Sequence, residues 1–129
     1  MIYLDSSVAL AHLLAEDRVP PDWIWDESLI ASRLLEYEVW TRINARRLSQ
    51  SHGDLVQALL VRIALVELVS PVLTRALEPF PLPVRTLDAL HLSSIDFLRE
   101  QGQAVQLASY DDRQRACAVA LQIPLIDLR

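Results

Sequence analysis

Lysine is absent from this chain of 129 residues: its twelve basic side chains are all arginine, beside seventeen acidic ones, and the net charge is −5. A receiver-type phosphoacceptor domain needs a lysine to bind the phosphoryl group, so the missing lysine argues against that class. The negative charge argues at first against a nucleic-acid partner. Arginine nevertheless binds phosphate through two hydrogen bonds at once, so a genomic bias toward arginine and a role in phosphate recognition both remain open.

Glycine and cysteine are also scarce. The two glycines, Gly53 and Gly102, are far apart. Phosphate loops and dinucleotide-binding turns need clustered glycines that let backbone amides approach phosphate, so both kinds of site are excluded. The one cysteine, Cys117, cannot form a disulfide within the chain, and its apolar helical setting predicts a buried thiol. A reducing compartment, the cytoplasm, fits this composition.

No apolar run approaches the ~20 residues that span a bilayer. The first residues include Asp5 and lack the basic region of a secretory signal. Hydrophobic residues make up 52% of the chain, which is enough to build a folded core. We therefore expect a single domain over residues 1–129, located in the cytoplasm and without a membrane partner.

Short apolar segments alternate with helical patterns, which is typical of an α/β domain with a parallel sheet. A serine is expected to cap the first helix, and Thr86 the fifth. We expect strands at residues 1–5, 28–32, 103–109 and 123–128, and a further strand in 66–72 is left open. We expect helices at 6–17, 32–48, 51–68, 73–80, 85–102 and 110–122, and a loop or short irregular helix at 18–27.

Acidic residues recur where these elements begin or end. Asp5 closes the first strand, Asp111 follows the third, Asp88 lies in a first helical turn, and Glu36 or Glu38 lies early in another helix. Sites in open parallel sheets form at the carboxyl ends of strands. Clustered carboxylates repel one another, and a hard divalent cation removes that cost. Oxygen ligands without cysteine predict Mg²⁺ or Mn²⁺ and metal-assisted hydrolysis of a phosphodiester.

Four segments carry a resemblance to a known family: "IYLDSS", "LLEYEVWTRI", "VRTLDALHLSSI" and "LASYDDRQRACAVALQIPLI". Their order and spacing over nearly the full chain resemble a PIN domain of the VapC toxin type. The resemblance implies a Rossmann-like three-layer α/β/α sandwich with four to five mainly parallel strands. It also implies a Mg²⁺- or Mn²⁺-dependent endoribonuclease, the toxin of a toxin–antitoxin pair, which cuts RNA, is neutralised by a VapB-type antitoxin and forms a homodimer.

Carried over by position, the resemblance assigns four catalytic and metal-binding carboxylates: Asp5, Glu38, Asp88 and Asp111. The family's helix glutamate falls six residues after the serine that ends the second strand, and counting from Ser32 reaches Glu38. Helical residues two apart point ~200° apart, so Glu36 and Glu38 cannot serve one site. Glu36 is therefore expected at the surface, where an ion pair with Arg33 is adequate.

Several supporting residues follow from the same comparison. Ser6 and Ser7 stand where the family has a hydroxyl that steadies the metal-bound water, and Ser109 occupies a usual Ser/Thr position. Asp112 either assists the site or starts the final helix, and we favour the second role. His91 either supports the site or packs within the fold, and again we favour the second. The candidate contacts to RNA or to the antitoxin are Arg85, Arg113 and Arg42.

Two alternatives remain beside the endoribonuclease. One is a catalytically silent PIN scaffold that only binds a partner, which the presence of all four acids makes the weaker reading. The other is a Mg²⁺-dependent phosphoacceptor or phosphatase domain. Phosphatases of the haloacid-dehalogenase type usually carry Asp-x-Asp after the first strand, but the second position here is Ser7.

Overall fold

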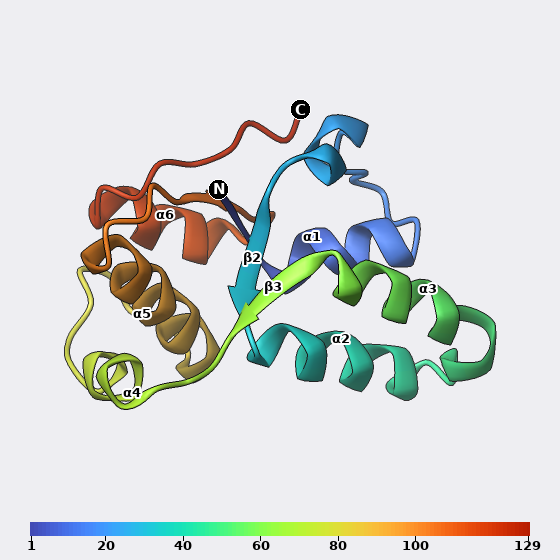
Figure 1. The fold of residues 1–129 in the computed structure, drawn as a ribbon, viewed down its shortest axis with the longest axis horizontal. Coiled ribbons are helices and arrows are strands. Elements are labelled where there is room, and N and C mark those ends of the chain that lie inside the picture. The colour runs from blue at the N-terminus through green and yellow to red at the C-terminus, as the bar shows by residue number, and fades with distance from the viewer.

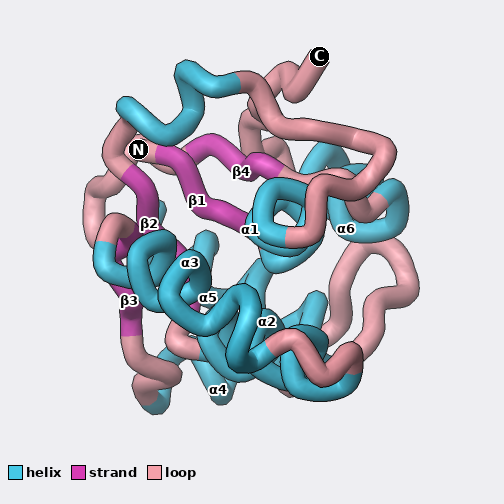
Figure 2. The backbone as a smooth tube through the Cα atoms, turned by 90° about the vertical axis from the view of Figure 1, so that its right-hand side faces the viewer, coloured by secondary structure: helices cyan, strands magenta, loops and turns pink.

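A parallel sheet of four strands forms the middle of the protein in this computed structural model, which describes residues 1–129. The strands are β1 (Ile2–Leu4), β2 (Leu29–Ser32), β3 (Ile63–Val66) and β4 (Gln106–Ala108). They lie side by side in the order β3, β2, β1, β4 (Figure 2), and all three pairings are parallel. The carboxyl ends of the strands therefore meet at one edge of the sheet.

Helices cover both faces of this sheet. They are α1 (Ser6–Leu13), η1 (Asp22–Asp26, a 3₁₀ helix), α2 (Leu34–Ala45), α3 (Ser49–Val61), α4 (Ser70–Ala76), α5 (Thr86–Glu100) and α6 (Asp112–Ala120). Figure 1 shows α1, α2 and α3 on one side of the strands and α4, α5 and α6 on the other. The expected α/β/α sandwich is confirmed. None of the helices combines the length and the apolar character needed to cross a membrane.

The alternation of side chains along β1 separates two cores. Ile2 and Leu4 pack with the buried residues of α1, α2 and α3. Tyr3 points the other way and packs with Leu92 and Ile95 of α5. Successive strand residues face opposite sides of a sheet, so this division follows from the strand itself. It places the Tyr3 ring beneath α5.

The expected helix at residues 51–68 is wrong in its second half. The helix α3 ends at Val61, and residues 63–66 form β3, an edge strand paired only with β2. Its register runs from Leu29 opposite Ile63 to Ser32 opposite Val66. A short apolar run suits a buried helix or a strand equally well, and only the pairing with β2 decides between them.

The expected strand at residues 123–128 is also wrong: it is reduced to one bridge, between Leu107 and Leu125. The Leu107 N–H donates to the Pro124 carbonyl and the Ile126 N–H donates to the Leu107 carbonyl, both at 2.8 Å. Pro124 has no N–H with which to extend the ladder.

Most helix starts shift by one to three residues from the sequence prediction, and two of them have a clear physical reason. The helix expected at residues 73–80 begins earlier, at Ser70, with Pro71 in its first turn, and ends at Ala76 ahead of the prolines. Proline suits this place because a helix leaves its first N–H groups without partners. The fifth predicted helix is capped by Arg85, and Thr86 is already its first helical residue.

Candidate active site

Asp5 lies directly after β1 and joins the sheet to α1. Its side chain accepts the Ser7 N–H at 3.3 Å, so Asp5, and not a serine, is the N-cap of α1. Its Oδ2 atom also accepts the Ser7 hydroxyl at 2.6 Å and the Ser109 hydroxyl at 2.9 Å. No protein group donates a hydrogen bond to Oδ1. The serines therefore hold one carboxylate oxygen and leave the other free to bind a ligand.

Asp5 is only 5% exposed, and its environment favours the neutral acid. Burial raises the pKa of Asp5, and the negative charge of Glu38 raises it further. The hydrogen bonds from Ser7 and Ser109 and the charge of His91 lower the pKa but do not cancel the effect of burial. A buried carboxylate of this kind is costly to ionise unless a cation accompanies it.

Glu38 reaches the same region from α2. Its side chain is 19% exposed. The Oε1 atom lies 2.5 Å from His91 Nε2, and Oε2 accepts the Ser6 hydroxyl at 3.3 Å. Both carboxylate oxygens of Glu38 therefore have partners from other elements, α5 and α1.

Glu36, the other glutamate of α2, faces away from this region. Its carboxylate pairs with Arg33 at 3.2 Å, and Arg33 also binds Glu67 at 2.6 Å. The surface ion pair expected for Glu36 is confirmed.

Asp88 and Asp111 complete the group from two further helices. Asp88 is half-buried in the first turn of α5, where it accepts the Arg85 N–H at 3.4 Å. Asp111 is exposed and caps α6 by accepting the Gln114 N–H at 3.1 Å. Burial raises the pKa of Asp88, and the charges of Asp111 and Asp5 raise it further. The two aspartates and Asp5 are therefore close enough to repel one another.

The four predicted carboxylates share one hollow of about 860 Å³ at the carboxyl edge of the sheet. Its polar and charged lining residues are Asp5, Ser6, Ser7, Glu16, Asp17, Arg18, Glu38, Arg42, Arg85, Thr86, Asp88 and Asp111. The lining comes from the ends of β1 and β4, from α1 and the loop after it, from the middle and last turn of α2, and from the starts of α5 and α6. Such a crevice outside strand ends is where ligands bind in open parallel sheets.

Three other predicted residues lie outside the lining. Ser109 is buried beneath the hollow, where its hydroxyl accepts the Asp111 N–H and donates to Asp5. Asp112 is exposed as the first residue of α6, the role we favoured for it. Arg113 follows it on α6 and does not line the hollow.

The structure also adds residues that the sequence patterns missed. Arg18, from the loop after α1, lines the hollow and donates to the Tyr110 carbonyl at 3.1 Å. His91 was favoured as a packing residue, but it contacts Glu38 directly and is 1% exposed. Its position one turn after Asp88 was the only sign of this role. No sequence pattern indicated a role for Arg18, because a loop residue has no periodicity that would place it.

The same carboxylates raise the pKa of His91. Burial alone lowers the pKa of His91, but the hydrogen bond and charge of Glu38, together with the charges of Asp5 and Asp88, raise it above its ordinary value. The imidazole therefore stabilises negative charge at this edge of the sheet.

The donor set fits Mg²⁺ or Mn²⁺ by its chemistry. All four side chains offer carboxylate oxygens, which hard cations prefer, and the repulsion at Asp88 is what a bound cation would relieve. No three His, Cys, Asp or Glu side chains stand close enough to enclose one ion by themselves. Mg²⁺ typically keeps several waters and takes only one or two carboxylates, so open spacing is compatible with it.

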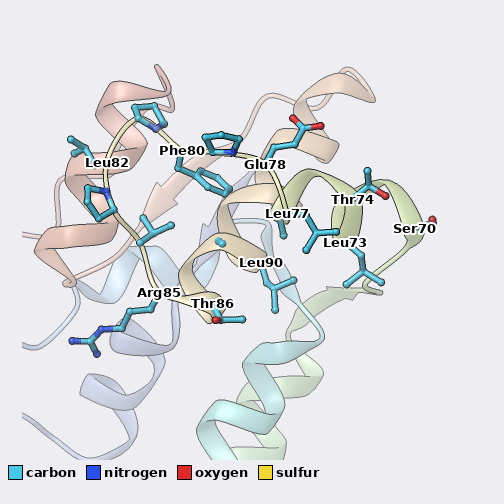
Figure 3. A pocket seen from close by; sticks show the side chains of 16 residues that line it. Ser70, Leu73, Thr74, Leu77, Glu78, Phe80, Leu82, Arg85, Thr86 and Leu90 are labelled. Carbon is cyan, nitrogen blue, oxygen red and sulfur yellow. The ribbon is translucent and has the colours of Figure 1, made fainter.

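A second hollow, of about 770 Å³, lies between α4, the prolines at 79–83 and the start of α5. Figure 3 shows Leu73, Leu77 and Leu90 gathered in it, while the side chain of Arg85 extends away from them. Glu78 is the one carboxylate in its lining. With a single carboxylate, this hollow lacks the cluster of acids that would hold a metal ion for hydrolysis of a phosphodiester.

Comparison with known proteins identifies the family of this chain. A family model of the PIN domain matches residues 2–120. Ribonuclease VapC35 of Mycobacterium tuberculosis, from strains CDC 1551 / Oshkosh and ATCC 25618 / H37Rv, is 30% identical over 132 residues, covering 98% of this chain and 96% of the relative. The crystal structure of VapC20 from Mycobacterium tuberculosis, a sarcin–ricin loop cleaving toxin, shares the fold with a TM-score of 0.67 and 17% identity, covering 90% of this chain and 94% of the other. This chain therefore belongs to the PIN domain family, among the VapC-type ribonucleases.

Proposed function

We propose that this protein is a metal-dependent endoribonuclease and the toxin of a toxin–antitoxin pair. The observation that carries the proposal is the meeting of Asp5, Glu38, Asp88 and Asp111, from four separate segments, around one hollow. Four carboxylates at one place destabilise a fold unless they serve a ligand. The relationship to a VapC ribonuclease supports RNA as the substrate.

Each group has a distinct part in this proposal. The four carboxylates would share Mg²⁺ or Mn²⁺ with bound water molecules, and the ion would supply neutralisation of charge on the phosphoryl oxygens and a more acidic water. The serine hydroxyls of Ser7 and Ser109 orient the Asp5 carboxylate through Oδ2. Ser6 does the same for Glu38 through Oε2.

Arginines at the rim of the hollow supply contacts to the RNA backbone. Arg18, Arg42 and Arg85 line the hollow beside the carboxylates. Their positive charge offsets the acidic lining and attracts phosphate groups on either side of the cleaved bond. Arg113 lies outside the lining, so a contact with the antitoxin suits it better than one with RNA.

The partners follow from the family. We propose a VapB-type antitoxin that covers the hollow or its rim, a homodimer in solution, and a cytoplasmic location. A binding scaffold without catalysis is the second candidate. The four carboxylates around the hollow favour the enzyme over the scaffold.

The decisive experiment compares wild-type protein, Asp5→Asn and Glu36→Gln on total RNA with Mg²⁺, Mn²⁺ or EDTA, followed by sequencing of the new RNA ends. We expect metal-dependent cuts at defined positions with wild type and Glu36→Gln, and none with Asp5→Asn. Cleavage in the presence of EDTA, or by the Asp5→Asn protein, contradicts the proposal. RNA binding without cleavage under every metal condition favours the scaffold.

A further inference from the structure

A row of buried polar groups runs from the sheet to Glu38. Tyr3 of β1 is 0% exposed and His91 of α5 is 1% exposed. The Ser32 N–H donates to the Tyr3 hydroxyl oxygen at 3.1 Å, this hydroxyl lies 2.7 Å from His91 Nδ1, and His91 Nε2 lies 2.5 Å from Glu38 Oε1. The row therefore links β2, β1, α5 and α2 through side chains that have no contact with solvent, except at Glu38.

The Tyr3 hydroxyl can accept from the backbone and donate to His91 at the same time. The Ser32 amide can only donate, so it takes one acceptor position on the Tyr3 oxygen, and the Tyr3 hydroxyl can then donate to Nδ1 of a neutral His91. A neutral imidazole that accepts at Nδ1 carries its proton at Nε2 and donates it to Glu38. A charged imidazole also donates from Nε2. The bond to Glu38 has the same direction in both states.

Packing alone does not explain this arrangement. Tyr3 packs with the apolar side chains of Leu92, Ile95 and Leu107, and His91 is buried as deeply. Buried polar groups are costly unless they are hydrogen-bonded. Apolar residues would fill the same space without that cost. The row ends at the Glu38 carboxylate, which lines the hollow. Its hydrogen bonds restrict the Glu38 side chain, which is otherwise free to rotate about three bonds.

We propose that Tyr3 and His91 are positioning residues that hold the Glu38 carboxylate in its orientation toward the metal site. Ser6 fixes the Oε2 atom and His91 fixes the Oε1 atom, so the plane of the carboxylate is set before any ligand arrives. This inference rests on the proposed function, because it concerns the orientation of one proposed metal ligand. Hydrogen-bonded partners of metal ligands typically change metal affinity by about 10–100-fold when removed.

The test uses two substitutions that separate the two ring nitrogens. In His91→Gln the side-chain amide reaches about where Nε2 stands and keeps a donor for Glu38. In His91→Asn the amide reaches only to the place of Nδ1, so it keeps a partner for Tyr3 and loses Glu38. Tyr3→Phe removes the hydroxyl that orients the His91 imidazole. Binding of Mn²⁺ is measured by calorimetry without RNA, beside the melting temperature of each variant.

We expect the Kd for Mn²⁺ to rise at least ~10-fold in His91→Asn and to change less than ~3-fold in His91→Gln. We expect the Kd of Tyr3→Phe for Mn²⁺ to rise as well. If His91→Asn does not fold, Tyr3→Phe tests the inference in its place. Equal affinity for wild type, His91→Asn and Tyr3→Phe, with lowered melting temperatures only, overturns the inference and leaves the proposed function intact. Wild-type protein that neither binds Mn²⁺ nor cuts RNA overturns both.

Discussion

Glu36 and Glu38 stand two residues apart on α2 and take part in separate networks. Glu36 pairs with Arg33 at the surface, and Glu38 bonds His91 and Ser6 at the edge of the hollow. The divergence follows from helical geometry, since residues two apart point ~200° apart. One short stretch of helix therefore contains a proposed metal ligand and its own matched control.

The first prediction uses this pair. Glu38→Gln should lower the rate of RNA cleavage by ~100-fold or more, because losing a metal ligand removes several kcal/mol of charge stabilisation in the transition state. Glu36→Gln should leave the rate within about threefold, since it breaks only a surface ion pair. Initial rates on a labelled RNA measure both. Loss of activity in Glu36→Gln with activity kept in Glu38→Gln would show that the register was misassigned.

The second prediction concerns metal and stability. Mn²⁺ at about 100 times its Kd should stabilise the folded protein by about 2.7 kcal/mol, because it binds the native state alone. For a domain of this size that is a rise of roughly 10 °C in the melting temperature. EDTA should reverse the rise, and Asp88→Asn should diminish it. A melting temperature that does not change when Mn²⁺ is added would argue against a metal site at the four carboxylates.

The third prediction concerns the cost of the buried Asp5 carboxylate. Its pKa is raised in the folded protein above the ordinary value of 3.8, mainly by burial. The folded state therefore binds the proton more tightly than the unfolded chain does. As the pH rises from about 3.8 through the folded pKa, the metal-free protein should lose stability, and the loss is complete once the pH lies above the folded pKa.

Asp5→Asn removes this penalty while keeping an N-cap of equal quality. In EDTA at pH 7 the variant should be more stable than wild type, by about 0.5–2 kcal/mol, the range typical of a single stabilising substitution. Near pH 3.5 the two proteins should differ little. Urea unfolding at both pH values measures the difference. Equal stability at pH 7 would mean that the carboxylate costs nothing in the folded protein.

The fourth prediction separates the arginines. Arg85→Gln and Arg42→Gln should weaken RNA binding and lower the slope of log K against log salt by about 0.7 for each phosphate contact removed. Arg113→Gln should change neither, because Arg113 does not line the hollow. Binding measured in a catalytically inactive Asp5→Asn background, at three salt concentrations, gives the slopes. If Arg113→Gln weakens RNA binding and lowers the slope as much as the other two substitutions do, Arg113 also contacts RNA.

The positions of the acids were predictable because they depend on local signals. Asp5 and Asp111 follow apolar strands, and parallel strands bring their carboxyl ends to one edge. Asp88 lies in the first turn of a strongly patterned helix. Each inference needed only the order of strands and helices, which alternation and turn residues reveal.

The edge strand β3 was not predictable in the same way. Residues 63–66 continue the apolar pattern of α3, and nothing within the segment marks where the helix stops. The pairing of Ile63 with Leu29 decides the conformation, and the two residues are far apart in sequence. Arg18 was missed for a related reason, because its place depends on a contact with Tyr110 across the fold.

The amino-acid order by itself determined that an α/β sheet forms, that acids stand at its carboxyl edge, and that two glutamates of one helix diverge. These are consequences of short-range periodicity and backbone geometry. Only the tertiary structure decided that His91 touches Glu38, that Tyr3 orients His91, and that Asp112 stays outside the hollow. Hydrogen bonds between segments 50 or more residues apart depend on how whole layers pack, and no local pattern records that.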